Sequence, residues 1–207
     1  MIKKHTIFFI VSVIVASEVL IGCSKPIEKI EKSYSSSEIN KIDIITNAND
    51  IYLTGKETEN VTINYIGSKK ELATLDNGVL TIDIHETFAG FTTSPIEPLY
   101  IEIPQNQISS ICLKSDAGNI KIDNVRASDL IAATEVGNIT AIGLNGKIKA
   151  ETSVGKIETS LPIGNDIIDG KDGLGNILNI ENNSGDNNDN SEFNSNLYTN
   201  TGVITLE

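Results

Sequence analysis

The stretch Thr134-Glu135-Val136-Gly137-Asn138-Ile139-Thr140-Ala141 is one copy of a unit that recurs along the second half of the chain. Aligned on its glycine without gaps, it matches residues 115–122 (SDAGNIKI) and 152–159 (TSVGKIET), and successive glycines lie 19 and 18 residues apart. Apolar and polar residues alternate on both sides of each glycine, a period of two that is typical of β-strands. Each copy is therefore predicted to form a strand, a turn and a second strand.

Two further segments fit the same alignment. Residues 199–206 carry Gly202 at the central position, and residues 46–53 carry Asn49 there. Asparagine tolerates a positive φ better than other non-glycine residues, so a left-handed backbone is expected at Asn49. The predicted turn positions are Asn49, Gly118, Gly137, Gly155 and Gly202.

Residues 77–82 are a weaker copy with two interpretations. They form either a sixth repeat or the two-residue turn of a hairpin between residues 71–75 and 79–84, because Asn-Gly is typical of such turns.

The same positions stay apolar from copy to copy, which indicates strands stacked in register. A repeat of 18–19 residues is too short to include the helix of a βαβ unit. We therefore expect an all-β, single-domain parallel β-solenoid over residues 38–207, with rungs about 4.8 Å apart.

Residues 164–196 interrupt this pattern with an insert rich in Asn, Asp and Gly. Within it, Asp166, Asp169 and Asp172 recur every third residue and suggest calcium binding. Their spacing matches neither an EF-hand loop nor the glycine-rich repeat of calcium-bound β-rolls. We expect an acidic loop here and no metal site.

The N-terminus carries a targeting signal. Lys3 and Lys4 precede an apolar run of about ten residues, which is too short to span a bilayer but fits a secretory signal. The next segment, Leu20-Ile21-Gly22-Cys23, resembles a lipobox, the motif at which bacterial signal peptidases cut before a lipid-modified cysteine. The resemblance implies that residues 1–22 are removed and that Cys23 carries lipid.

This processing would leave residues 23–37 as a flexible tether to the membrane. The domain would then lie outside the cytoplasm, on the outer face of the cell membrane in a Gram-positive host or at the outer membrane in a Gram-negative one.

Charge and cysteine content exclude several classes of function. The formal net charge is −12, and Arg126 is the single arginine, so binding to nucleic acid is disfavoured. The chain has two cysteines, and lipid on Cys23 leaves Cys112 without a disulfide partner. Alternation places Cys112 on the outward side of its strand.

Candidate catalytic groups are few and scattered. His85 is the one histidine after the signal segment, and the strand period places it outward beside Asp83. No G-x-S-x-G motif supplies a nucleophile, the outward carboxylates and lysines are scattered singly, and Arg126 is expected at a corner after Val125. We therefore expect no catalytic residues and no cofactor.

The order of segments resembles a known family. A strand ending in Ile103-Pro104 is followed, about a dozen residues later, by Gly118-Asn119-Ile120 and the further glycine-centred units. This resembles the DUF4097-type putative adhesin family of bacterial envelope β-solenoids, over roughly residues 38–207. Together with the lipobox, the resemblance implies a surface lipoprotein with an adhesin-like binding or scaffolding role and no catalysis, whose ligand would be a protein or a glycan. The alternatives are a polysaccharide lyase or hydrolase, and an envelope-stress or partner-sensing module.

Overall fold

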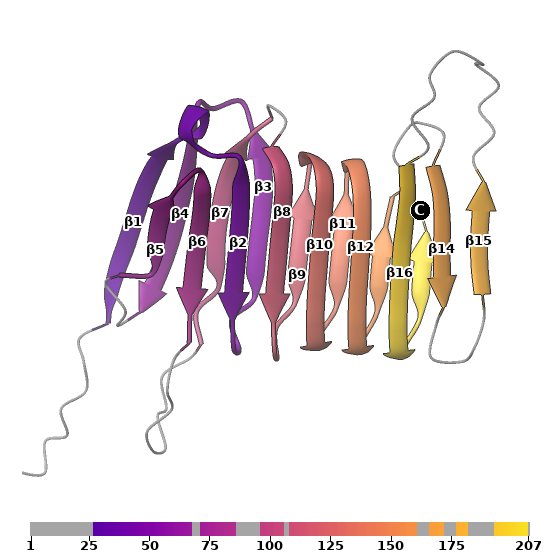
Figure 1. Ribbon diagram of the computed structural model, residues 1–207. Helices are drawn as coiled ribbons and strands as arrows, with labels where there is room; N and C mark the ends of the chain where they lie inside the picture. Colours follow the sequence, from indigo (N-terminus) through magenta and orange to yellow (C-terminus); the bar gives the residue numbers. More distant parts are fainter. Residues whose placement is uncertain are drawn as a thin grey trace, which may run out of the picture.

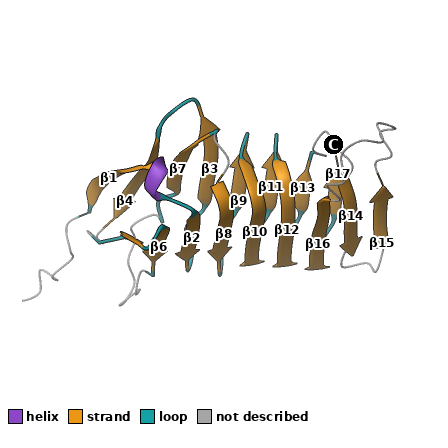
Figure 2. Ribbon diagram, turned by 45° about the horizontal axis from the view of Figure 1, so that its top comes forward, coloured by secondary structure: helices purple, strands orange, loops and turns teal. Residues whose placement is uncertain are grey.

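The computed structural model describes residues 27–67, 71–85, 96–105, 108–160, 166–171, 177–181 and 193–206. These residues form two stacked β-sheets whose strands are mostly parallel, as Figures 1 and 2 show. The predicted all-β solenoid is thus confirmed. The lipobox and Cys23 lie outside the described residues.

One sheet, here called sheet A, holds eight described strands. In spatial order they are β1 (Glu28–Ser35), β4 (Asn60–Gly67), β7 (Leu99–Pro104), β3 (Ile51–Lys56), β9 (Ile120–Asp123), β11 (Ile139–Ile142), β13 (Ile157–Thr159) and β17 (Ile204–Leu206).

The facing sheet, sheet B, holds nine described strands. In spatial order they are β15 (Ile177–Glu181), β14 (Asp166–Lys171), β16 (Phe193–Thr201), β12 (Asn145–Val154), β10 (Arg126–Val136), β8 (Ile108–Ser115), β2 (Lys41–Thr46), β6 (Val79–Ile84) and β5 (Ala73–Asp76). A single turn of 3-10 helix, η1 (Ser36–Glu38), joins β1 to β2. No helix among the described residues is long and apolar enough to cross a membrane.

The core lies between the sheets because alternate residues of every strand point inward. Sheet A contributes a column of isoleucines to the core. In sheet B the core side chains of β2 and β8 are larger than those of β10 and β12. The isoleucine column is Ile51, Ile120, Ile139, Ile157 and Ile204, each 7% exposed or less. One sheet B column runs Ile44, Leu113, Ala132, Ala150 and Leu197.

The spatial order of rungs differs from the chain order. Strands β2 and β3 form the first rung to appear in the sequence, yet they lie between β6/β7 and β8/β9. Strands β4 to β7 lie on one side of this rung. The chain then crosses to the other side, where β8 follows. From β8 to β13 the rungs follow the sequence in order, as the repeat predicts.

The predicted tether is wrong for residues 28–35. They form β1, which pairs antiparallel with β4 along its whole length, from Glu28 opposite Gly67 to Ser35 opposite Asn60. Its inward residues Ile30 and Tyr34 pack against the core, and this contact explains why the segment is ordered. The only described residue before β1 is Ile27.

The predicted insert also contains regular structure. Residues 166–171 and 177–181 form the antiparallel pair β14 and β15, and β14 pairs parallel with β16. Strand β16 begins at Phe193, earlier than the insert's predicted end at residue 196. The rest of the proposed excursion, residues 182–192, lies outside the described residues.

Two turn predictions have opposite outcomes. The hairpin interpretation of Asn77-Gly78 is confirmed, because both residues have positive φ, 49° and 80°, and β5 pairs antiparallel with β6. Asn49 is not among the described non-glycine residues with positive φ, so that expectation is wrong. Its amide instead donates a hydrogen bond of 2.8 Å to the carbonyl oxygen of Glu97. Besides Asn77, the described asparagine with a positive φ is Asn124, at 54°.

Candidate binding surface

A column of close backbone contacts holds the rungs at the turn from sheet B to sheet A. A methyl group built on Gly137 would lie 2.2 Å from the carbonyl oxygen of Gly118, and one on Gly155 would lie 1.9 Å from that of Gly137. Gly118 and Gly202 make the same approach to Asn49 and Gly155, at 2.3 and 1.7 Å. Any side chain larger than hydrogen would therefore push successive rungs apart.

Buried hydroxyl groups satisfy the carbonyl oxygens of this column. Thr134 Oγ1 donates to Gly118 O at 3.0 Å, Thr152 Oγ1 to Gly137 O at 2.9 Å, and Thr199 Oγ1 to Gly155 O at 3.2 Å. Each hydroxyl belongs to the residue three positions before the next glycine. The chemistry thus explains why the repeat has Thr or Ser at that position, since a buried carbonyl without a donor is costly.

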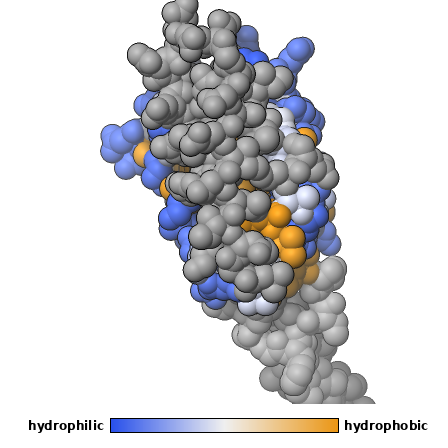
Figure 3. Space-filling model, turned by 90° about the vertical axis from the view of Figure 1, so that its right-hand side faces the viewer, coloured by the Kyte–Doolittle hydropathy of each residue, from blue (hydrophilic) through white to orange (hydrophobic). Residues whose placement is uncertain are grey.

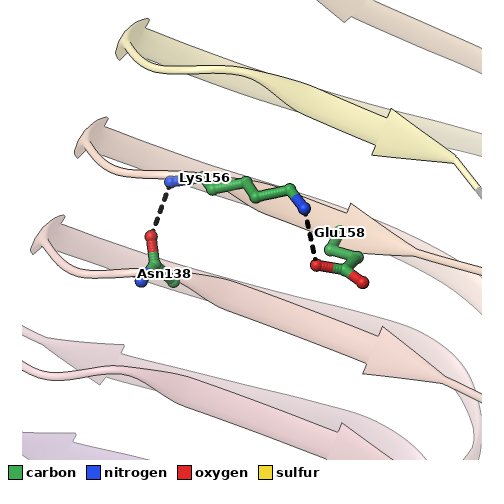
Figure 4. Close-up of polar contacts among 3 residues, drawn as sticks. All are labelled: Asn138, Lys156 and Glu158. Carbon is green, nitrogen blue, oxygen red and sulfur yellow. Dashed lines mark hydrogen bonds and ion pairs between the residues drawn. The ribbon is translucent and has the colours of Figure 1, made fainter.

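An exposed asparagine ladder runs beside the glycines. Asn119 Oδ1 accepts from the Asn138 amide at 2.9 Å, and Asn138 Oδ1 accepts from the Lys156 amide at 2.8 Å. Figure 4 shows the second bond, together with the Lys156 Nζ contact of 2.8 Å to Glu158. The ladder starts at Asp50, whose carboxylate accepts from the Asn119 amide at 2.7 Å. These contacts fix the rung spacing and make the stack a rigid frame.

The outer face of sheet A carries the most distinctive exposed cluster of the described residues. In register across β4, β7, β3, β9 and β11 lie Asn64, Tyr100, Tyr52, Lys121 and Thr140. We call this row and its neighbours Thr54, Thr62 and Glu102 the tyrosine face. Strand pairing on both sides fixes the backbone of this face, so the side chains project from fixed Cα positions.

The two tyrosines stack on each other at the centre of this face. Their ring centroids are 5.0 Å apart, with an angle of 15° between the ring planes. Tyr100 is 49% exposed. Its neighbour on the other side is Asn64. Partial burial raises the pKa of Tyr52, and the nearby Asp50 and Tyr100 add to the shift.

Polar groups surround the pair. Thr54 lies opposite Glu102, and Thr62 lies opposite Glu102 on the other side. Lys56 Nζ makes an ion pair with the Glu102 carboxylate. The surface therefore combines aromatic rings with hydroxyl, amide and carboxylate groups, all on one flat sheet.

The sequence does carry a signal for this cluster. Ile51-Tyr52-Leu53 and Leu99-Tyr100-Ile101 have the same apolar–Tyr–apolar pattern, and the structure pairs them residue by residue. The two segments are 48 residues apart, and Leu99-Tyr100-Ile101 belongs to no copy of the repeat, so the repeat spacing does not indicate that they are neighbours.

The candidate catalytic residues do not come together. His85 follows the end of β6 and its Nδ1 lies 2.5 Å from Asp83 Oδ1, with both side chains half-exposed. Arg126 begins β10, which is separated from β6 by β2 and β8, and it lies at the opposite end of these parallel strands. His85 and Arg126 are thus on separate parts of sheet B.

Cys112 lies on the outer face of sheet B between Asp43 and Ile131 and is partly buried. Burial raises the pKa of its thiol, while Lys114 opposes the shift. This environment favours the unreactive protonated form.

The structure does not test whether the acidic insert binds calcium. Asp166 and Asp169 belong to β14, whose side chains lie outside the description, and Asp172 lies outside the described residues altogether. Within the described part of the chain, no group of three or more His, Cys, Asp and Glu is placed to hold a metal ion.

In Figure 3, which views the C-terminal end of the stack, a small apolar area is visible next to hydrophilic side chains. Exposed valines lie at the turns of the last three regular rungs. They are Val136, Val154 and Val203, which are 55%, 49% and 50% exposed. Val136 and Val154 are neighbours in register on β10 and β12.

Comparison with known proteins gives a family and one similar fold. The family model described as Toastrack DUF4097 matches residues 39–207. A crystal structure of a putative cell adhesion protein from Clostridium sporogenes has a TM-score of 0.67 and 16% identity, covering 87% of this chain and 99% of that one. This level of likeness establishes a shared fold.

A crystal structure of a putative adhesin from Bacteroides fragilis aligns with a TM-score of 0.27 and 14% identity, over 90% of this chain and 100% of that one. No protein with curated annotation matches the chain significantly.

Proposed function

This chain belongs to the Toastrack DUF4097 family, and from that premise we propose that it is a lipid-anchored domain of the bacterial cell envelope that binds a polysaccharide without catalysis. The observation that carries the proposal is the stacked pair of the half-buried Tyr52 and the exposed Tyr100 on the outer face of sheet A. The signal segment and lipobox at Leu20 to Cys23 support the location.

The chemistry of the tyrosine face suits a sugar polymer. An aromatic ring packs against the C–H groups of a sugar, while hydroxyl and amide groups exchange hydrogen bonds with its hydroxyls. Tyr100 supplies the ring, and Asn64, Thr54 and Thr62 supply the polar groups beside it. The row runs along the stacking axis, a direction in which a chain of sugars can bind through several units.

The arrangement of titratable groups supports binding rather than turnover. A glycosidase requires two carboxylates on either side of one bond, and a lyase requires a base beside acidic ligands. On the tyrosine face, Glu102 is engaged with Lys56, and His85 and Arg126 lie on the other sheet. The name of the Clostridium sporogenes relative, a putative cell adhesion protein, agrees with a binding role.

The test is a sedimentation assay with insoluble cell-wall sacculi, freed of protein and extracted with acid to remove anionic polymers. We expect the processed chain to pellet with the sacculi and Tyr100→Ala to stay in the supernatant. The matched control is Tyr198→Ala, because Tyr198 is 39% exposed on sheet B, away from the tyrosine face.

Three results would overturn the proposal. The wild-type chain could fail to pellet, or Tyr100→Ala could pellet as well as the wild type. Release of new reducing ends from the sacculi would instead identify the protein as an enzyme.

A further inference from the structure

The first strand of the domain begins close to the lipid attachment site. Strand β1 starts at Glu28, so only residues 24–27 separate it from Cys23. From Cys23 to Ile27 a fully extended chain spans at most about 14 Å. Once Cys23 is anchored, the start of β1 is confined to the immediate neighbourhood of the lipid headgroups.

The structure places apolar side chains at this same corner. Ile27 is 55% exposed just before β1, and Ile66 is 44% exposed near the end of β4. The two are brought together by strand pairing, because Ile66 lies opposite Lys29 and Gly67 lies opposite Glu28. Lys29 lies beside them; its side chain is 68% exposed, and its Nζ is 3.6 Å from the exposed carboxylate of Glu31. We call Ile27, Lys29 and Ile66 the anchor corner.

This composition fits the interface of a lipid bilayer. Exposed branched apolar side chains enter the boundary between headgroups and acyl chains, and a neighbouring lysine contacts phosphate oxygens. The corner lies at the β1 end of sheet A, the end of the stack where sheet B ends in β5, while β14, β15 and β17 form the opposite end (Figure 1).

We propose that the anchor corner inserts into the membrane interface and that the β1 end of the stack therefore faces the bilayer. The β17 end then points away from the membrane, and the tyrosine face stands along the side of the stack. The inference rests on the proposed lipid anchor but not on the polysaccharide.

The experiment uses the absence of tryptophan from the sequence, so that a single introduced residue reports on its own position. The chain beginning at Cys23, carrying Cys112→Ser, is coupled through Cys23 to maleimide-bearing lipid in phosphatidylcholine vesicles. Ile66→Trp probes the anchor corner. Val203→Trp is the matched control, because Val203 is 50% exposed at the opposite end of the stack.

We expect brominated acyl chains in the vesicles to quench the emission of the Ile66→Trp variant strongly and to shift it to shorter wavelength. The emission of the Val203→Trp control should stay unchanged. A second probe, Ile27→Trp, precedes the first strand, so it leaves the strand pairing intact, and its emission should behave as that of Ile66→Trp does.

Two results would overturn the inference. Equal quenching of the Ile66→Trp and Val203→Trp variants would show a stack that lies flat on the membrane. Emission from the Ile27→Trp and Ile66→Trp variants that the vesicles leave unchanged would show that the anchor corner stays in water.

Chemical coupling replaces cellular lipidation in this test. A chain that is never lipidated in cells would refute the proposed anchor, whereas an unquenched Ile66→Trp variant on coupled vesicles would refute only the orientation. The two failures are therefore distinguishable.

Discussion

The hydroxyl of Thr134 donates a hydrogen bond of 3.0 Å to the carbonyl oxygen of Gly118, one rung away in the stack. The same carbonyl lies against the α-carbon of Gly137, three residues after Thr134. The threonine and the glycine of one rung thus both contact the same carbonyl group of the rung before it. The same two contacts recur for Thr152 with Gly155 and for Thr199 with Gly202. They explain why the repeat has a threonine three residues before its glycine.

Replacing Gly137 with alanine should destabilise the fold severely. The new methyl group would lie 2.2 Å from the carbonyl oxygen of Gly118, and the paired strands on both sides prevent the backbone from moving away. We expect a loss of at least about 2 kcal/mol in the free energy of unfolding, measured by urea denaturation.

Val136→Ala is the control for this substitution, because Val136 is 55% exposed in the same turn. It should change the free energy of unfolding by less than about 0.5 kcal/mol. Equal effects of the two variants would mean that the close approach of the rungs is unimportant.

Thr134→Val should remove the hydroxyl while keeping the shape of the buried side chain. The carbonyl of Gly118 then loses its side-chain donor, which costs about 1–2 kcal/mol. Thr134→Ser should retain most of the stability, and Thr140→Val, on the outer face of β11, should have little effect. If serine were no better than valine at position 134, the hydrogen bond would not be the reason for the recurring threonine of the repeat.

Asn138→Ala should weaken the exposed ladder by a smaller amount. The amide of Lys156 loses its acceptor at 2.8 Å but gains water, so we expect a cost of about 0.5–1 kcal/mol. Asn138→Asp keeps the acceptor oxygen, as Asp50 does at the start of the ladder, and should stay close to the wild type. An aspartate variant as unstable as the alanine variant would contradict the assigned role.

The thiol of Cys112 should react slowly in the folded chain. Burial raises its pKa above the ordinary value of 9.0, so alkylation by iodoacetamide in a Cys23→Ser background should reach half its maximal rate above pH 9. Because folding raises the pKa of this thiol, the thiol contributes to the free energy of unfolding below pH 9. That contribution is lost as the pH rises through the pKa of the thiol in the folded chain.

Cys112→Ser should therefore remove part of the alkaline loss of stability, as followed by urea denaturation at about pH 8 and pH 10, on either side of the unfolded pKa. A half-maximal alkylation rate at or below the pH found for the urea-unfolded chain would show that the thiol is not protected.

The regular part of the fold was predictable because its contacts are local. From β8 to β13 each rung pairs with the next one in the sequence, so a gapless alignment on Gly118, Gly137 and Gly155 reproduces the spatial register. The inward columns follow directly from the period of two.

The N-terminal third was less predictable because its pairings are distant. Strand β3 lies between β7 and β9, and no repeat spacing connects Tyr52 with Tyr100. Strand β1 has a charged, lysine- and glutamate-rich sequence that resembles a linker, and only its pairing with β4 buries Ile30 and Tyr34. The tyrosine face was therefore not predicted, whereas the stacked strands beneath it were.

The location of the protein is tested most directly by the mass of its N-terminal peptide, isolated from membranes after proteolysis. The lipobox at Leu20 to Cys23 predicts a peptide that begins at Cys23, lacks residues 1–22 and carries the added mass of a diacylglyceryl group on the cysteine. Cys23→Ser should abolish this species and release the chain from the detergent phase. A peptide that begins elsewhere, or an unmodified Cys23 in membrane-bound protein, would contradict the lipid anchor on which the proposed function depends.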